Sequence, residues 1–277
     1  MDEAFTALGH TVLYDIWDAR EIAAFGPCAV LFECKLILKE PFRFMRLARS
    51  LHKAGIPTAT WSLDIPNIGA RPWKIPLLIK SGLLDVFASH SMQGLPEISR
   101  ARSKIIYLPN AAWTSRYNLA GRSLEDLRAP DNSPIDVSFV GNLDSRKYPE
   151  HKHRTEFLKA LAERLEKLGL TYHFEGAALV AQEQIRLIQA SKINVTFGCG
   201  ADRPGNKSWG MPERCYGIPA CGGFLLADER MHARDDFVLD EEIVLFSNLD
   251  DCVEKVRYFR DAHRERRKIA ENAYAKV

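Results

Sequence analysis

Short apolar runs alternate with helix-patterned segments through the first 110 residues of the chain. The runs cover residues 11–14, 29–32, 58–61, 86–89 and 105–108, and each has the length and composition of a buried strand. Between them, as in residues 40–54, apolar positions recur at spacings of three and four. This alternation predicts a parallel sheet covered by helices.

The same alternation resumes after a stretch rich in turn-forming residues, 120–134. Strands are expected at residues 136–140, 171–174, 193–197, 224–227 and 243–246. Helices are expected at residues 154–168 and 181–190, and from residue 250 onward. The pattern therefore predicts two α/β domains, residues 1–119 and 135–277, joined by residues 120–134.

Composition describes an ordinary globular protein. The chain has 277 residues, 46% hydrophobic and 27% charged, which suits two domains with apolar cores. A formal net charge of +2 provides no concentrated basic footprint, so nucleic acid is not the favoured partner.

The six cysteines include no CxxC pair and no zinc-type spacing with histidine, so no metal site is predicted. Their apolar surroundings favour free buried thiols in a reducing compartment. No apolar run approaches the about 20 residues that span a bilayer, and no secretion signal is evident. We expect a cytoplasmic protein.

Residues 209–228, WGMPERCYGIPACGGFLLAD, are the segment richest in candidate chemistry. Arg214 carries a planar guanidinium suited to phosphate or carboxylate. Gly222 and Gly223 permit a tight turn and close backbone approach to a ligand. The segment therefore predicts an anion-binding site.

This segment resembles the signature of the group 1 glycosyltransferases, most closely the CgeB-like branch, R-x-F-E-I-x-A-C-G-G-F-x-L-x-D. The matching residues are Arg214, Tyr216, Ile218, Ala220, Cys221, Gly222, Gly223, Phe224, Leu226 and Asp228. The resemblance covers most of residues 135–262 and extends thinly into the first half. It implies the GT-B fold, in which two Rossmann-like, doubly wound domains face a cleft. It also implies a nucleoside diphosphate sugar, with uridine the expected base, as co-substrate and no other cofactor.

Two departures from the family pattern stand out. Gly217 occupies the position of a glutamate that reaches the ribose of the donor, and Glu213, one helical turn earlier, is the candidate substitute. Family members also open with a strand before a helix ending A-L-G-H, whereas this chain begins inside that helix, at residues 1–10. The first domain is therefore expected to lack its usual first strand, and three explanations stay open: a domain that tolerates the loss, a truncated start, or a strand supplied by another chain. The terminal helix is a candidate to pack back on that domain.

Ligands of open α/β sheets gather at the carboxyl ends of the strands. In the second half, Gly141, Asn142 and Arg146 follow the first strand, and Arg154 lies in the next helix, so these residues are candidates for phosphate. A solvated charged loop is the alternative. Further candidates for donor binding are Gly176, Lys192, Tyr216 and Gly217; Lys192 has a structural alternative.

Transfer requires stabilisation of the leaving diphosphate and a base for the acceptor hydroxyl. Arg214 is the candidate for the first role. Asp64, in a W-x-x-D-x-P segment similar to one in CgeB-like proteins, is the candidate base, with turn formation as its alternative; Glu33 is the second candidate. Acceptor-side candidates are Trp61, His90 and Asn110.

The sequence therefore favours a metal-independent glycosyltransferase that acts on a hexosyl nucleotide. Two alternatives stay open: a catalytically impaired protein that binds a sugar nucleotide or a partner, and a glycosyltransferase that modifies nucleic acid through the basic loop at residues 146–154. The acceptor and the oligomeric state are not predicted.

Overall fold

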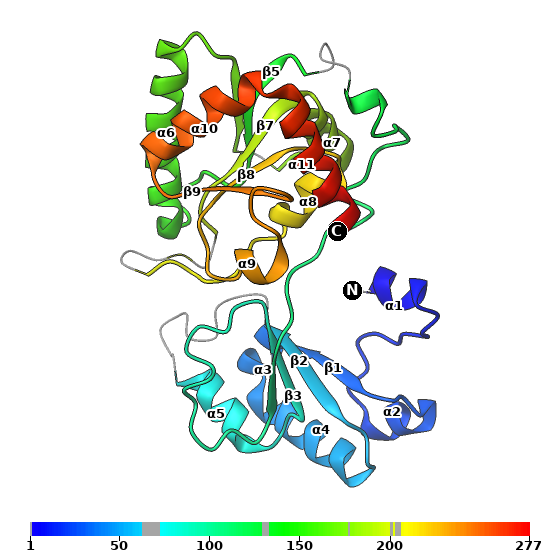
Figure 1. The fold of residues 1–277 in the computed structure, drawn as a ribbon. Coiled ribbons are helices and arrows are strands. Elements are labelled where there is room, and N and C mark those ends of the chain that lie inside the picture. The colour runs from blue at the N-terminus through cyan, green and yellow to red at the C-terminus, as the bar shows by residue number, and fades with distance from the viewer. Residues whose placement is uncertain (1, 63–72, 129–132, 177, 200–201, 203–205) are drawn as a thin grey trace. The chain divides into compact units, whose positions relative to one another are not determined.

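The computed structural model describes residues 2–62, 73–128, 133–176, 178–199, 202 and 206–277. The chain divides into two compact units, drawn in Figure 1. The first comprises Met1–Ser89 and Gly94–Leu108, and the second comprises His90–Gln93 and Pro109–Val277. Residues 109–119, which the sequence assigned to the first domain, therefore belong by their contacts to the second unit.

The first unit contains a parallel sheet in the order β1-β2-β3-β4. Its strands are β1 (Val30–Glu33), β2 (Thr58–Ser62), β3 (Val86–Ser89) and β4 (Lys104–Tyr107). Its helices are α1 (Asp2–Ala7), α2 (Ala19–Phe25), α3 (Cys34–Lys39), α4 (Pro41–Lys53) and α5 (Lys74–Ser81). All four strands lie within a residue of their predicted bounds. Phe32 packs edge-on against Phe44, with ring centroids 5.0 Å apart, and so joins the sheet to α4.

The strand predicted at residues 11–14 does not form. These residues have no regular structure, and Leu13 and Tyr14 are 48% and 56% exposed. Among the described residues, β1 is an edge strand that pairs only with β2. A strand requires a neighbour that satisfies its backbone groups, and an apolar composition does not supply one.

The second unit contains a parallel sheet in the order β6-β5-β7-β8-β9. Its strands are β5 (Ile135–Val140), β6 (Tyr172–Glu175), β7 (Ser191–Thr196), β8 (Leu225–Asp228) and β9 (Val244–Phe246). Its α-helices are α6 (Lys152–Lys167), α7 (Ala181–Gln189), α8 (Arg214–Ala220), α9 (Ala233–Asp236), α10 (Leu249–Asp261) and α11 (His263–Lys276), and short 3₁₀ turns are η1 (Asp126–Arg128) and η3 (Pro149–His151).

Apolar side chains cover both faces of this second sheet. One cluster joins the strands to α6, α10 and α11, and the other joins them to α7 and α8. Figure 1 shows α6 and α10 on one side of the sheet and α7 and α8 on the other. Burial on both faces explains why the strands are continuous apolar runs. The terminal helix α11 packs against α8 and α10.

All six cysteines are free thiols; Cys28 is exposed and the other five are buried. Among the residues that the structure describes, no helix is long and apolar enough to cross a membrane.

Candidate functional site

Two arginines meet at the carboxyl edge of the second sheet. Arg154, on α6, donates from Nε to the carbonyl of Phe197 and from Nη1 to the carbonyl of Asn142, each at 2.9 Å. Arg214, the first residue of α8, donates from Nη2 to the carbonyl of Gly198. The loops that follow β5 and β7 therefore hold both guanidinium groups through main-chain carbonyls.

The ring of Phe139 lies beneath both arginines. Its centroid is 6.0 Å from Cζ of Arg154 and 5.7 Å from Cζ of Arg214. Arg154 is 4% exposed; burial lowers its pKa to about 10, and the charge of Arg214 acts in the same direction. Nε of Arg214 is buried and has no hydrogen-bond partner in the described structure. Two adjacent cations held by neutral carbonyls create a site that favours an anion.

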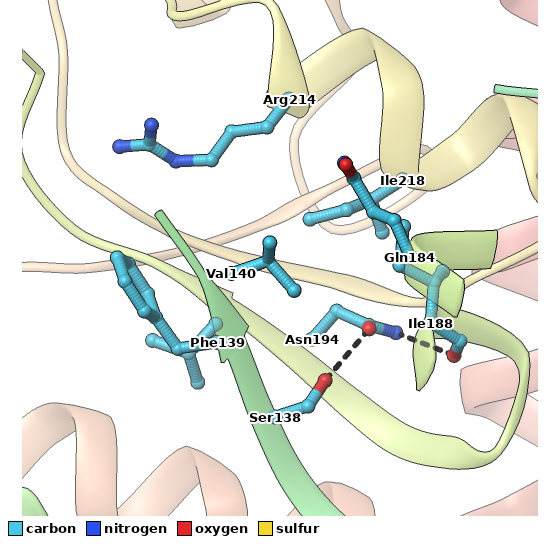
Figure 2. Close-up of a pocket in the computed structure, with 9 residues that line it drawn as sticks. Ser138, Phe139, Val140, Gln184, Ile188, Asn194, Arg214 and Ile218 are labelled. Atoms are coloured by element: carbon cyan, nitrogen blue, oxygen red, sulfur yellow. Dashed lines mark hydrogen bonds between the residues drawn. The ribbon is translucent and has the colours of Figure 1, made fainter. Parts of the chain in front are cut away.

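A small pocket lies between Arg214 and the sheet, as Figure 2 shows. Its walls come from β5, β7, α7 and α8, and its lining residues are Ser138, Phe139, Val140, Gln184, Ile188, Asn194, Val195, Arg214 and Ile218. Within it, the Ser138 hydroxyl donates to Oδ1 of Asn194 at 2.9 Å. The pocket measures about 10 Å³, roughly the room for one water. It is therefore too small for a sugar nucleotide.

The loop after β5 lies at the same edge. A Cβ on Gly141 would lie 2.9 Å from Cζ of Phe139, so only glycine fits over that ring. Oδ1 of Asn142 accepts the amide of Asp144 at 2.8 Å, and Oδ1 of Asp144 accepts the amide of Arg146 at 3.1 Å. These turns leave the Arg146 side chain exposed beside the loop. Gly141, Asn142 and Arg154 thus lie together at this edge of the sheet.

Gly176 follows β6, the neighbouring strand, at the same carboxyl edge. A Cβ there would lie 3.2 Å from Cβ of Leu143, in the loop after β5. The two loops therefore touch at this edge of the sheet.

The first turn of α8 also carries Glu213 at its N-cap position. Glu213 is exposed. Partial desolvation raises the pKa of its carboxyl above the ordinary value, while the charges of Arg116 and Arg214 lower it. Gly217, one turn later, lies under Tyr117: a Cβ at this glycine would be 2.4–2.6 Å from three atoms of the tyrosine ring. The place of the family glutamate is thus filled by an aromatic ring.

Sequence reasoning missed Arg116 and Gln184, which lie near the first turn of α8. Nε and Nη2 of Arg116 donate to Oε1 of Gln184 at 3.1 and 2.7 Å. Gln184 is 3% exposed and also lines the small pocket below Arg214. A polar side chain beside Ile185 on the inner face of α7 was the available signal for Gln184, whereas nothing local marks Arg116.

Gly222 and Gly223, predicted to bind the donor, lie at the opposite edge of the sheet. Their amides donate to the carbonyls of Pro219 and Ile218, at 2.7 and 3.0 Å, and so end α8. A Cβ on Gly222 would lie 2.7 Å from a methyl of Leu127, which shows that the glycine packs against residues 119–127. The amides are therefore occupied by the helix end, and this prediction is corrected.

The polar groups of Tyr216 and Lys192, two further candidates for donor binding, bond to aspartates of the same unit. The Tyr216 hydroxyl donates to Oδ2 of Asp236 at 2.6 Å and is buried. Nζ of Lys192 donates to Oδ1 of Asp136 at 2.7 Å, where β7 and β5 begin. Lys192 therefore takes the structural alternative, at the amino edge of the sheet and away from Arg214.

Of the candidates from the first half, Asp64 lies outside the described residues. Glu33 and Trp61 are register partners at the carboxyl ends of β1 and β2. Glu33 is exposed, and Nε1 of Trp61 donates to the carbonyl of Leu108 at 3.3 Å. The structure thus places Glu33 and Trp61 side by side in the first unit.

His90 and Asn110 both belong to the second unit, beside the loop that leads into α8. His90 is 3% exposed, and a Cβ on Gly210 would lie 2.2 Å from its Cδ2. Nδ2 of Asn110 donates to the carbonyl of Met211 at 2.7 Å. Both residues therefore contact the segment that precedes Arg214. In the described part of the chain, no three His, Cys, Asp or Glu side chains are grouped so as to hold a metal.

Residues 135–277 match the model of a family described as glycosyl transferase-like, and they make up just over half of the chain. The chain belongs to this family. The enzyme class predicted from the sequence, glycosyltransferase, is thereby confirmed. No curated protein sequence matches the chain.

Several solved glycosyltransferases share the fold. HepE from Anabaena, crystallised with UDP-glucose, is 14% identical, with 84% of this chain and 71% of HepE covered at a TM-score of 0.52. A UDP-forming α,α-trehalose-phosphate synthase from Burkholderia vietnamiensis is 11% identical, with coverages of 93% and 71% and a TM-score of 0.54. A glycosyltransferase from Rickettsia africae is 14% identical, with coverages of 93% and 87% and a TM-score of 0.55. At such identities the likeness shows the fold alone, and it confirms the predicted GT-B type.

Proposed function

We propose that this glycosyltransferase moves a hexosyl-type group from a UDP-linked sugar to an acceptor hydroxyl, and that its second unit holds the donor. The observation that carries the proposal is the pairing of Arg154 and Arg214 at the carboxyl edge of the sheet. Both guanidinium groups are bound by carbonyls and stacked over Phe139, so their charge is available to a diphosphate.

Uridine as the base rests on similar proteins. HepE was crystallised with UDP-glucose, and the trehalose-phosphate synthase is UDP-forming. Membership of the CgeB-like branch is a finer proposal, which rests on the match between residues 214–228 and that signature. A cytoplasmic location is proposed from the free thiols, because a reducing compartment keeps them unpaired.

In the proposed reaction, negative charge grows on the diphosphate as its bond to the sugar breaks. In this proposal Arg214 meets that charge and Arg154 adds a second fixed cation, so the chain's own groups would stabilise the leaving group without a metal. Glu213, on the first turn of α8, is the proposed acceptor for the ribose hydroxyls. Asp64 and Glu33 remain the proposed bases for the acceptor.

Binding of UDP, measured by titration calorimetry, tests this assignment. A charge-assisted hydrogen bond contributes about 1.5–3 kcal/mol, so Arg214→Ala is expected to weaken UDP binding by about 10- to 150-fold. Lys192→Ala is the matched control, because it removes a cation from the amino edge of the same sheet. Equal affinities of Arg214→Ala and wild type would exclude Arg214 from the donor site. Hydrolysis of UDP-glucose with and without a chelator tests metal independence.

A second candidate function is donor binding without transfer. The observation that favours it is the replacement of the family glutamate by Gly217, with Tyr117 packed against it. UDP binding without release or transfer of sugar, across a panel of donors and acceptors, would support this candidate against the enzyme.

A further inference from the structure

A buried ionic cluster holds the loop that follows β7. The side chain of Arg230 is fully buried between two carboxylates, with Nη2 at 2.7 Å from Oδ2 of Asp202 and 2.9 Å from Oδ2 of Asp228. Its Nη1 also donates to the carbonyl of Ser208 at 3.1 Å. Asp228 ends β8, whereas Asp202 and Ser208 belong to the loop, so Arg230 ties the loop to the sheet.

Asp202 continues the connection toward the arginine pair. Its Oδ2 accepts the amide of Cys199 at 2.9 Å, and its Oδ1 accepts the amide of Ser208 at 2.8 Å. The two residues before Cys199 are Phe197 and Gly198, whose carbonyls receive Arg154 and Arg214. The carboxylate of Asp202 therefore holds the amide of Cys199, which is directly bonded to the carbonyl group of Gly198. It thereby fixes the backbone next to the two carbonyls that orient Arg154 and Arg214.

Burial and neighbouring charges shift the pKa values of Asp202 and Arg230 in opposite directions, and the net shift favours the charged form of each. Burial alone would raise the pKa of Asp202, but the hydrogen bond and charge of Arg230 outweigh it and bring that pKa to about 2. Burial alone would lower the pKa of Arg230, but Asp228 and Asp202 hold it well above its usual value. Asp202 and Arg230 are therefore both charged at neutral pH.

We propose that Arg230 and Asp202 are positioning residues for donor binding, because they hold the carbonyls of Phe197 and Gly198 that orient Arg154 and Arg214. This inference rests on the proposed function of that arginine pair. It assigns no contact with the donor to Arg230 itself. A buried cluster that served stability alone would leave donor affinity unchanged when it is weakened.

The test compares Asp202→Asn with Asp136→Asn. Asp136 is also a buried carboxylate in this unit, 2.7 Å from Nζ of Lys192 and bonded to the amide of Thr171, but it lies at the amino edge of the sheet. Both variants are expected to lower the melting temperature. Only Asp202→Asn is expected to raise the Kd for UDP, by at least about tenfold, because displaced guanidinium groups lose their alignment.

The kinetics of UDP-glucose hydrolysis further distinguish a positioning role of the cluster from a purely stabilising one. Asp202→Asn is expected to raise KM for UDP-glucose hydrolysis and to lower kcat, whereas Asp136→Asn changes neither at a temperature where it is folded. Arg230→Lys keeps the charge but loses the fork, so its Kd should fall between those of wild type and Asp202→Asn. If Asp202→Asn does not fold, Arg230→Lys is compared with Asp136→Asn in its place.

The outcomes distinguish the two levels of the argument. If Arg214→Ala weakens UDP binding but Asp202→Asn and Arg230→Lys bind like Asp136→Asn, positioning is overturned and the proposed function stands. If wild type binds no UDP, both are overturned. A higher Kd for Arg214→Ala and for both cluster variants, with Asp136→Asn at the wild-type value, supports the inference.

Discussion

The close contact between Gly217 and Tyr117 predicts that any side chain at position 217 destabilises the protein while the tyrosine ring is present. A Cβ at Gly217 would lie 2.4, 2.5 and 2.6 Å from Cδ1, Cε1 and Cγ of Tyr117. Carbon atoms in contact prefer about 3.5–4.0 Å, so the ring or the helix would have to move by about 1 Å. Tyr117 is only 5% exposed, which leaves the ring little room to move aside.

The magnitude follows from two opposing effects. Overpacking of a buried site costs about 1–3 kcal/mol, and the three contacts of 2.4–2.6 Å place this site in the upper half of that range, at about 2–3 kcal/mol. Replacement of a helical glycine by alanine returns about 1 kcal/mol. We therefore expect Gly217→Ala to reduce the free energy of unfolding by about 1–2 kcal/mol. With Tyr117 replaced by alanine the clash disappears, and the same Gly217→Ala change should stabilise the protein by about 1 kcal/mol.

Urea unfolding of the two single variants and the double variant measures this coupling. Tyr117→Phe is the matched control, because it keeps the ring, so Gly217→Ala should cost as much in that background as in wild type. The interpretation fails if Gly217→Ala is as stable as wild type, or if its cost is the same with and without the ring. For the same reason, Gly217→Glu is expected to leave UDP binding unimproved unless Tyr117 is made smaller.

Three further predictions concern charged and thiol groups. Because the pKa of Asp202 is about 2 in the folded protein against an ordinary value of 3.8, its ionised form stabilises the fold by about 2 kcal/mol above about pH 4. That stability is lost as pH falls toward 2, and acid titration of Asp202→Asn should show a flatter profile over this range. Lys192→Ala should cost about 1–3 kcal/mol in urea unfolding, since it removes the main partner of buried Asp136; an unchanged midpoint would contradict this. Iodoacetamide at pH 8 should label exposed Cys28 first, by mass spectrometry, because burial raises the pKa of Cys221 to about 12; early labelling of Cys221 would contradict its burial.

The sequence was most informative where structure follows from local pattern. The runs at residues 58–61 and 86–89 became β2 and β3 because buried parallel strands are apolar on both faces. Residues 11–14 have a similar composition, yet they are exposed and form no strand. Pairing depends on neighbours brought together by the whole fold, and a local window contains no information about them.

The site shows the same limit. Arg154 and Arg214 could be predicted, because each lies near a strand end or a helix start where anions are expected. The ion pair between Arg230 and Asp202 could not be predicted, since the two residues are 28 positions apart and neither lies in a recognisable motif. Tyr117 and Gly217, which pack together, are even further apart in the sequence. From the sequence alone, Gly217 therefore indicated only the loss of a glutamate, and not that a tyrosine ring occupies the space beside it.

The geometry of α8 explains why the glycosyltransferase-like signature was partly misinterpreted. Arg214 opens this helix and Gly222 follows eight residues later, so the two are separated by about 12 Å at 1.5 Å per residue. The arginine lies at the carboxyl edge of the sheet, whereas the amides of Gly222 and Gly223 close the helix at the other edge. A diphosphate bound by Arg214 therefore lies a helix length away from both glycines. The motif contains two parts with different physical roles: a guanidinium that we propose faces the ligand, and two glycines that end the helix, of which Gly222 lets residues 119–127 pack closely.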